Sequence, residues 1–181
     1  YIEKELPVQE YKTKDKTISY YNWKYYPIKT KILSISSETE QLQSVIPGGL
    51  VGIQLDIDPG FTRNDKLVGN MIFSLSKEKD YPFKVCDKIK INIDDIFPDI
   101  KTREKKEIKL YKGYRIKINI YSNETTGFVV KYNQKENYIS IILDNPVMID
   151  ENVTKVILSE EKTNNILAIC SIINIRICNS I

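Results

Sequence analysis

Two aspartates near the middle of the chain offer the first possible chemistry. Asp56 and Asp58 are two residues apart, so on a β-strand both carboxylates would point to the same face. A carboxylate pair on one face can hold a shared proton and act as a general acid. The same spacing is also typical of a polar, exposed strand edge, and this is the interpretation that we favour.

The chain contains no histidine among its 181 residues, which excludes Ser-His-Asp and Cys-His nucleophiles and zinc sites built on histidine. Its three cysteines, Cys86, Cys170 and Cys178, show no Cys-x-x-Cys spacing. We interpret them as small buried hydrophobic residues of a reducing compartment, with a disulfide or a metal site as the alternative. No set of catalytic side chains emerges, so we expect no catalytic residue, no metal and no cofactor in this chain.

Basic residues are concentrated in one segment. The whole chain has 27 Lys and Arg against 24 Asp and Glu, a net charge of +3 that alone predicts no nucleic-acid binding. Residues 101–109, however, carry five positive and two negative side chains. Two interpretations stay open: a solvated loop, or a loop that contacts phosphates. The candidate phosphate contacts are Lys101, Arg103, Lys105 and Lys106.

Apolar and polar residues alternate along the C-terminal two-thirds of the chain, as half-buried strands require. The predicted strands are 88–93, 115–120, 126–132, 138–143, 154–159 and 166–177, with turns at 133–137, 144–146 and 159–162. The last strand is nearly all apolar, which predicts burial on both of its faces. Short strands at this spacing favour an all-β barrel or sandwich.

The first third of the chain is less regular, with predicted strands at 28–35 and 41–45. Five rings lie within seven positions: Tyr20, Tyr21, Trp23, Tyr25 and Tyr26. Such a cluster can stack on nucleic-acid bases, or it can pack a strand onto the wall of a barrel. We favour packing.

Five of the seven glycines lie between residues 45 and 69. This segment predicts a tight turn at 47–49, a strand over 50–57, a second turn at 58–60 and a polar loop at 62–65. Gly52 would let a second backbone or a ligand approach that strand closely. A composition change after Gly69 suggests a boundary, dividing the chain into domains 1–73 and 74–181.

Residues 47–69 read PGGLVGIQLDIDPGFTRNDKLVG and closely resemble the second domain of the gamma subunit of archaeal and eukaryotic translation initiation factor 2. Residues 26–35 are similar to a strand of the same domain, and 145–147 with 156–159 resemble motifs of the third domain. Two departures concern the family's contact with the alpha subunit: 54–56 read QLD where the family has GTK, and 12–26 lack its glycine-rich half. The chain contains no phosphate-binding loop and no N-K-x-D guanine motif.

The resemblance implies an all-β fold of two small barrels, of the domain II and domain III types of translational GTPases, with the first incomplete and no GTPase domain. It implies that the chain helps to bind methionylated initiator tRNA and to dock it on the small ribosomal subunit. The implied partners also include the alpha and beta subunits of the factor, in the cytoplasm and away from membranes. GTP and magnesium are expected only if a GTPase domain is attached upstream.

The candidate residues for the tRNA acceptor end are Pro47, Gly48, Gly49, Leu50, Val51, Gly52, Arg63 and Lys66. Arg63 could instead form a surface ion pair with Asp58 or Asp65. Two other functions stay open. One is a stand-alone RNA- or protein-binding module of the same ancestry, and the other is the tail barrels of a selenocysteine-specific elongation factor.

Overall fold

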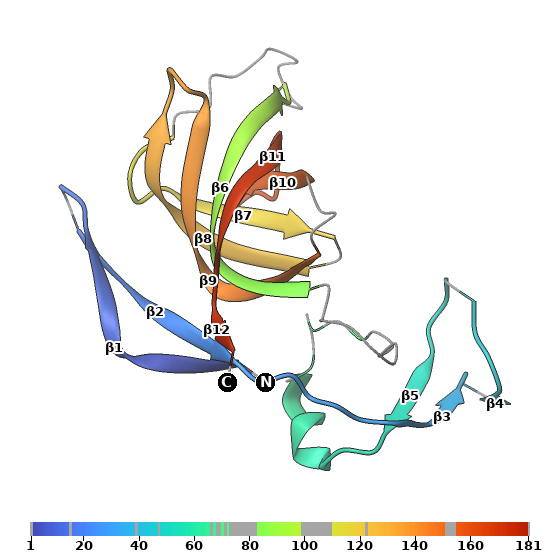
Figure 1. Ribbon diagram of the computed structural model, residues 1–181. Helices are drawn as coiled ribbons and strands as arrows, with labels where there is room; N and C mark the ends of the chain where they lie inside the picture. The colour runs from blue at the N-terminus through green and yellow to red at the C-terminus, as the bar shows by residue number, and fades with distance from the viewer. Residues whose placement is uncertain are drawn as a thin grey trace. The chain divides into compact units, whose positions relative to one another are not determined.

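Strands make up most of the regular structure of this chain. The computed structural model describes residues 2–14, 16–38, 40–46, 48–65, 67, 70, 72, 83–98, 110–121, 123–150 and 155–180. Within these ranges the regular elements are β-strands and two short 3-10 turns, and the predicted all-β class is confirmed (Figure 1). In the same ranges, a helix with the length and apolar character to cross a bilayer is not found.

Six antiparallel strands close into a barrel in the order β10-β11-β6-β9-β8-β7, because β7 pairs back onto β10 (Figure 1). They are β6 (Phe83–Ile96), β7 (Arg115–Ile120), β8 (Asn123–Asn133), β9 (Tyr138–Asp150), β10 (Lys155–Glu160) and β11 (Ile166–Ile177). All six strands predicted for this part of the chain are present. The bounds of β7 and β11 agree with the prediction to the residue.

The interior of the barrel is filled by the isoleucines of the alternating pattern. On β7, Ile116, Ile118 and Ile120 are fully buried, while Arg115 and Lys117 point outward. Each fully buried isoleucine side chain contributes about 1.5–3 kcal/mol through the hydrophobic effect. The closed barrel therefore has an apolar core of its own.

Gly127 faces Leu143 at a crowded place between β8 and β9. A Cβ atom at this position would lie 2.4 Å from the carbonyl oxygen of Ile142 and 3.0 Å from a side-chain carbon of Ile141. The first distance is far shorter than a carbon–oxygen contact allows, so a side chain here would push the two strands apart.

The prediction that residues 166–177 are buried on both faces is wrong. Ala168 and Cys170 are fully buried in the barrel, but Ile173 is 51% exposed and Ile166 is 46% exposed. A strand in a closed antiparallel barrel has one face in the lumen and one outside, unlike a strand of a parallel sheet covered on both sides. Apolar composition alone does not distinguish the two cases.

The turn predicted at 144–146 is also wrong, because β9 runs on through these residues. The pairing of β9 with β6 shifts register here: Lys88 faces Ile142, whereas Cys86 faces Val147. Asp144, Asn145 and Pro146 therefore occupy a bulge, where a proline is tolerated because no ladder hydrogen bond is lost.

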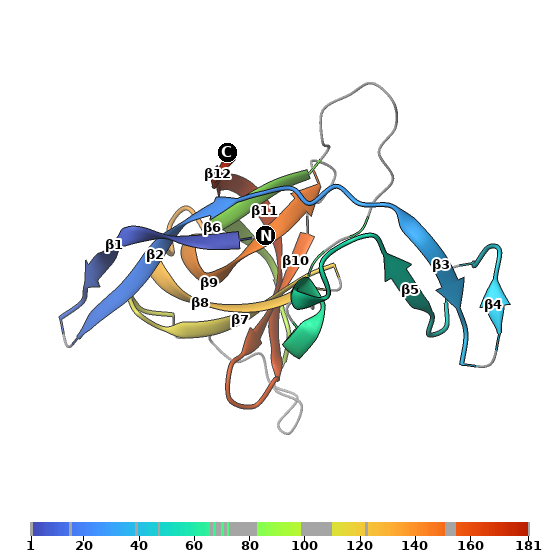
Figure 2. The same ribbon diagram turned by 90° about the horizontal axis from the view of Figure 1, so that it is seen from below.

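An N-terminal hairpin packs on the outside of the barrel (Figure 2). Its strands are β1 (Ile2–Lys12) and β2 (Thr17–Tyr25), and β2 also pairs in parallel with the short β12 (Asn179–Ser180). The Tyr11 hydroxyl donates a hydrogen bond to the backbone carbonyl of Val130. The rings of Tyr11 and Tyr20 lie 5.8 and 6.1 Å from that of Phe128.

Four of the five rings of the aromatic cluster in the first third belong to this packing. Trp23 is buried against Val85 and Cys178, with Tyr21 and Tyr25 partly buried beside it. The preferred interpretation, a strand packed on a barrel wall, is confirmed for these rings.

The described residues form two compact units, Tyr1–Tyr26 with Gly69–Ile181, and Pro27–Val68. The second unit holds an open sheet in the order β4-β3-β5, formed by β4 (Gln41–Leu42), β3 (Ile32–Ser36) and β5 (Gly52–Leu55). Two 3-10 turns follow, η1 (Pro59–Phe61) and η2 (Arg63–Asp65). The sequence division into 1–73 and 74–181 stays a prediction, and the structure adds that the hairpin packs with the barrel.

Candidate nucleic-acid interface

Gly48 and Gly49, which belong to the tight turn predicted at 47–49, lie open to solvent. Gly48 and Gly49 have φ of +104° and +99°, which side chains rarely tolerate, and a Cβ atom on either would meet no atom within 4 Å. Leu50 is 87% exposed, and Ile46, which the sequence prediction did not include, is 85% exposed. The backbone of Gly48 and Gly49 is therefore accessible, and the apolar side chains of Ile46 and Leu50 nearby in sequence are exposed.

Gly52 has a structural reason to be glycine. It pairs with Ser36 in the β3–β5 ladder, and an added Cβ would lie 3.0 Å from the Ser36 hydroxyl oxygen. The residue is exposed, and its neighbour Val51 is half-buried. The close approach expected at Gly52 is thus made by the neighbouring strand.

The two aspartates do not share a strand face, because β5 ends at Leu55. Both are exposed, and Asp58 accepts a hydrogen bond from the backbone N–H of Gly60 at 2.6 Å, capping η1. The strand predicted over 50–57 is therefore too long, and the carboxylate pair on one strand face is wrong.

The predicted cationic residues are only partly described. Arg63 is exposed at the start of η2, and the next residue, Asn64, has a left-handed backbone with φ of +56°. The remaining candidates lie outside the described residues: Pro47, Lys66, Lys101, Arg103, Lys105 and Lys106. Their roles stay predictions.

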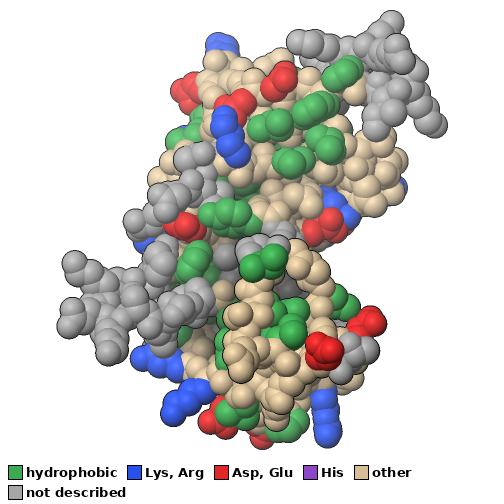
Figure 3. Space-filling model, turned by 90° about the vertical axis from the view of Figure 1, so that its right-hand side faces the viewer, with side chains coloured by type: hydrophobic (Ala, Val, Ile, Leu, Met, Phe, Trp, Pro, Cys, Tyr) green, Lys and Arg blue, Asp and Glu red, His purple; other side chains and the backbone are tan. Residues whose placement is uncertain are grey.

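The sheet of this second unit is amphipathic. Ile35 pairs with both Leu42 and Ile53 on one face, while the Ser34 hydroxyl donates to the side-chain oxygen of Gln54 at 2.9 Å on the other. None of the described residues from 27 to 67 is buried. Its apolar side chains lie open in the space-filling view (Figure 3), as a surface that meets a partner would.

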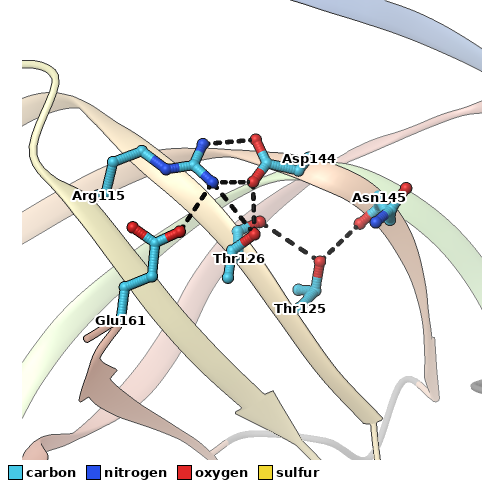
Figure 4. A network of polar contacts seen from close by, with 6 residues as sticks. All are labelled: Arg115, Thr125, Thr126, Asp144, Asn145 and Glu161. Atoms are coloured by element: carbon cyan, nitrogen blue, oxygen red, sulfur yellow. Dashed lines mark hydrogen bonds and ion pairs between the residues drawn. The ribbon is translucent and has the colours of Figure 1, made fainter. Parts of the chain in front are cut away.

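On the barrel, by contrast, several outer charges form ion pairs with one another. Arg115 binds both carboxylate oxygens of Asp144, at 2.8 and 2.5 Å, and contacts Glu161 at 3.1 Å (Figure 4). Thr126 donates to the same carboxylate, and Thr125 donates to the backbone carbonyl of Asn145 at 3.1 Å. The hydrogen bond to Asp144 raises the pKa of the Arg115 guanidinium. This network ties β7, β8 and β9 to the turn after β10.

The three cysteines are buried with free thiols, as the preferred interpretation predicts. Burial raises the pKa of the Cys170 and Cys178 thiols to about 12 and that of Cys86 in the same direction. These groups stay protonated near neutral pH, and the protonated thiol is neither a good nucleophile nor a metal ligand.

No protein-family model matches this chain. Individual proteins do. The gamma subunit of eukaryotic translation initiation factor 2 from Encephalitozoon cuniculi is 28% identical over 116 residues, which are 64% of this chain and 25% of that protein. Subunit 3 of the same factor from Drosophila melanogaster is 28% identical over 141 residues, 77% of this chain and 29% of that protein.

An archaeal relative matches a shorter segment more closely. The gamma subunit of translation initiation factor 2 from Methanococcus vannielii is 40% identical over 48 residues, 26% of this chain and 12% of that protein. The matched segments cover less than a third of each of these three relatives. Over these segments the chain is similar in sequence to the gamma subunits of archaeal and eukaryotic translation initiation factor 2.

Proposed function

We propose that this chain acts in translation initiation by binding methionylated initiator tRNA, with the turn at 48–50 receiving the acceptor end. The observation that supports this most is the open turn itself. Its two positive-φ glycines leave the backbone accessible between Ile46 and Leu50, whose side chains are almost entirely exposed. The sequence motif around this turn is also the one that most closely resembles the gamma subunits.

The chemistry of the turn suits the end of a charged tRNA. Backbone groups without a neighbouring Cβ can approach a ribose or an ester closely. Exposed aliphatic side chains can cover a methionine side chain or the face of a terminal base. Arg63, exposed in the same unit, is our candidate for a phosphate contact.

The wider assembly is part of the same proposal. We expect docking on the small ribosomal subunit, contacts with the alpha and beta subunits, and action in the cytoplasm. Chemistry on GTP, with magnesium, would be supplied by a GTPase domain and by no residue of this chain.

Binding of labelled tRNA to the purified chain tests the proposal. Methionylated initiator tRNA is expected to bind more tightly than its deacylated form or a selenocysteinyl-tRNA. L50S is expected to weaken that binding roughly tenfold, because it removes apolar contact area at the turn. L33S is the matched control, since Leu33 is also exposed, at 56%, but lies away from the turn in sequence. Equal affinities for the charged and uncharged tRNA would contradict the proposal.

A further inference from the structure

One stretch of the barrel's outer wall, where β11, β6, β9 and β8 lie side by side, carries a polar and basic grid. The strand register pairs residues across it in rows. One row is Ser171, Asn92, Tyr138 and Asn133, and the next is Asn174, Lys90, Ser140 and Lys131. Neither row contains a carboxylate.

Two lysines of this wall converge on one aromatic ring. The ammonium of Lys90 lies 3.8 Å from the centroid of the Tyr138 ring, and that of Lys131 lies 5.3 Å from it. The ring is 6% exposed, so the lysine side chains lie over it. Cation–π attraction favours each ammonium at this place, and Lys131 is also exposed to solvent.

The charges of this wall are not neutralised as they are elsewhere on the barrel. Lys117 pairs with Glu124 at 2.6 Å and Lys155 with Asp94 at 2.7 Å. Among the described residues, Lys90 and Lys131 form no ion pair, although Glu136 in the β8–β9 turn influences Lys131. Lys88 extends the patch on β6, since residues two apart on a strand share a face and lie roughly 6.5 Å apart.

Preorganised cations make a good surface for phosphates. A lysine already held on a ring loses less side-chain freedom when it binds an anion. The amides and hydroxyls around it (Asn92, Asn133, Asn174 and Ser140) are groups that bind phosphate and sugar oxygens without reading sequence. The hydrogen bond to Tyr138 also raises the pKa of Lys131, which keeps it charged.

We propose that this wall binds the phosphate backbone of an RNA, with Lys90 and Lys131 as paired phosphate contacts and Lys88 as a third. The choice of RNA among polyanions rests on the proposed function. The wall belongs to the barrel, whereas the turn at 48–50 belongs to the other unit, so the two surfaces can be tested separately.

The test uses the 181-residue chain and a labelled RNA stem-loop that carries no aminoacyl group. K90Q/K131Q removes two wall charges, and K112Q/K162Q removes two exposed charges from the turns before β7 and after β10. The wall variant is expected to bind roughly tenfold more weakly, with a log–log salt dependence shallower by about 1.5, as the loss of two phosphate contacts predicts. The control is expected to stay within about twofold of the parent chain.

Equal losses in the two variants would overturn the proposal, because net charge alone would then explain binding. Loss of polyglutamate binding with unchanged RNA binding would overturn it too, in favour of an acidic protein. Thermal unfolding midpoints within a few degrees of the parent are required of both variants. If K90Q/K131Q binds the stem-loop normally while L50S still weakens methionylated initiator tRNA, the wall proposal fails and the proposed function stands.

Discussion

The closed barrel and the unit at 27–68 are built from similar residues but are stabilised differently. The barrel encloses a core of fully buried isoleucines, and several of its surface charges form ion pairs. The smaller unit has a three-stranded sheet with an apolar face, yet none of its described residues is buried. We therefore expect the barrel to be stable by itself, whereas the smaller unit exposes apolar surface that a partner could cover.

The largest expected effect is in the barrel core. I118A removes a fully buried side chain and should lower the free energy of unfolding by about 3–4 kcal/mol. I53A, at an exposed position in the smaller unit, should cost under about 1 kcal/mol. Urea unfolding measures both, and similar losses would show that the units share one core.

A second test concerns the ion pair between the buried Asp87 of β6 and the half-exposed Arg176 of β11. Asp87, 3% exposed, accepts two hydrogen bonds from Arg176, at 2.7 and 2.8 Å. R176L leaves that carboxylate buried without a partner and should cost about 3 kcal/mol. D87L/R176L should recover at least part of this loss, and a double variant less stable than R176L would contradict the explanation.

Hydrogen exchange compares the two units directly. Amides in β3 and β5 should exchange roughly 100-fold or more faster than those in β7, because local opening there exposes little new apolar surface. The full chain is exchanged at neutral pH, and mass spectrometry of its peptides then measures the exchange of each strand. If a bound tRNA slows exchange in β5 but not in β7, the smaller unit is the one that a partner stabilises.

The smallest effect is electrostatic. Hydrogen bonds from Lys155 and then Ser171 hold the pKa of Asp94 below its usual value. A carboxylate with a lowered folded-state pKa stabilises the fold above its unfolded-state pKa, near 4, and loses this contribution as pH falls through the lower, folded value. Because the pair is largely exposed, the gain at pH 7 should be about 0.5 kcal/mol or less. D94N should remove it, as thermal unfolding at pH 7 and pH 3 would show.

Periodicity predicted the barrel strands well because each must bury one face, and β7 shows this residue by residue. Periodicity does not reveal that the sheet closes into a barrel. For this reason the outer face of β11 was wrongly predicted to be buried. The DNP run at 144–146 has turn-forming residues, but a bulge accommodates them within β9. Ion pairs such as Arg115 with Asp144 join residues 29 apart and depend on strand register, which no local pattern encodes.

The candidate site was predictable to a similar degree. The glycine turn follows from its residues, since proline and glycine there favour a tight turn with positive φ. The sequence analysis predicts the turn at 133–137, but it does not predict that Lys90 and Lys131 contact Tyr138. Aligning β8 with β9 across that turn would have placed Lys131 opposite Ser140.

The crowding at Gly127 bears on how relatives of this protein should be compared. At that position a methyl group would strike the backbone of the adjacent strand, so selection for folding alone retains glycine, whatever the protein binds. At Gly48 and Gly49 there is room for a methyl group, and only the backbone angle opposes it. Evolutionary constancy at Gly127 would thus report the architecture of the ring, and only constancy at exposed positions such as Leu50 would report a shared ligand.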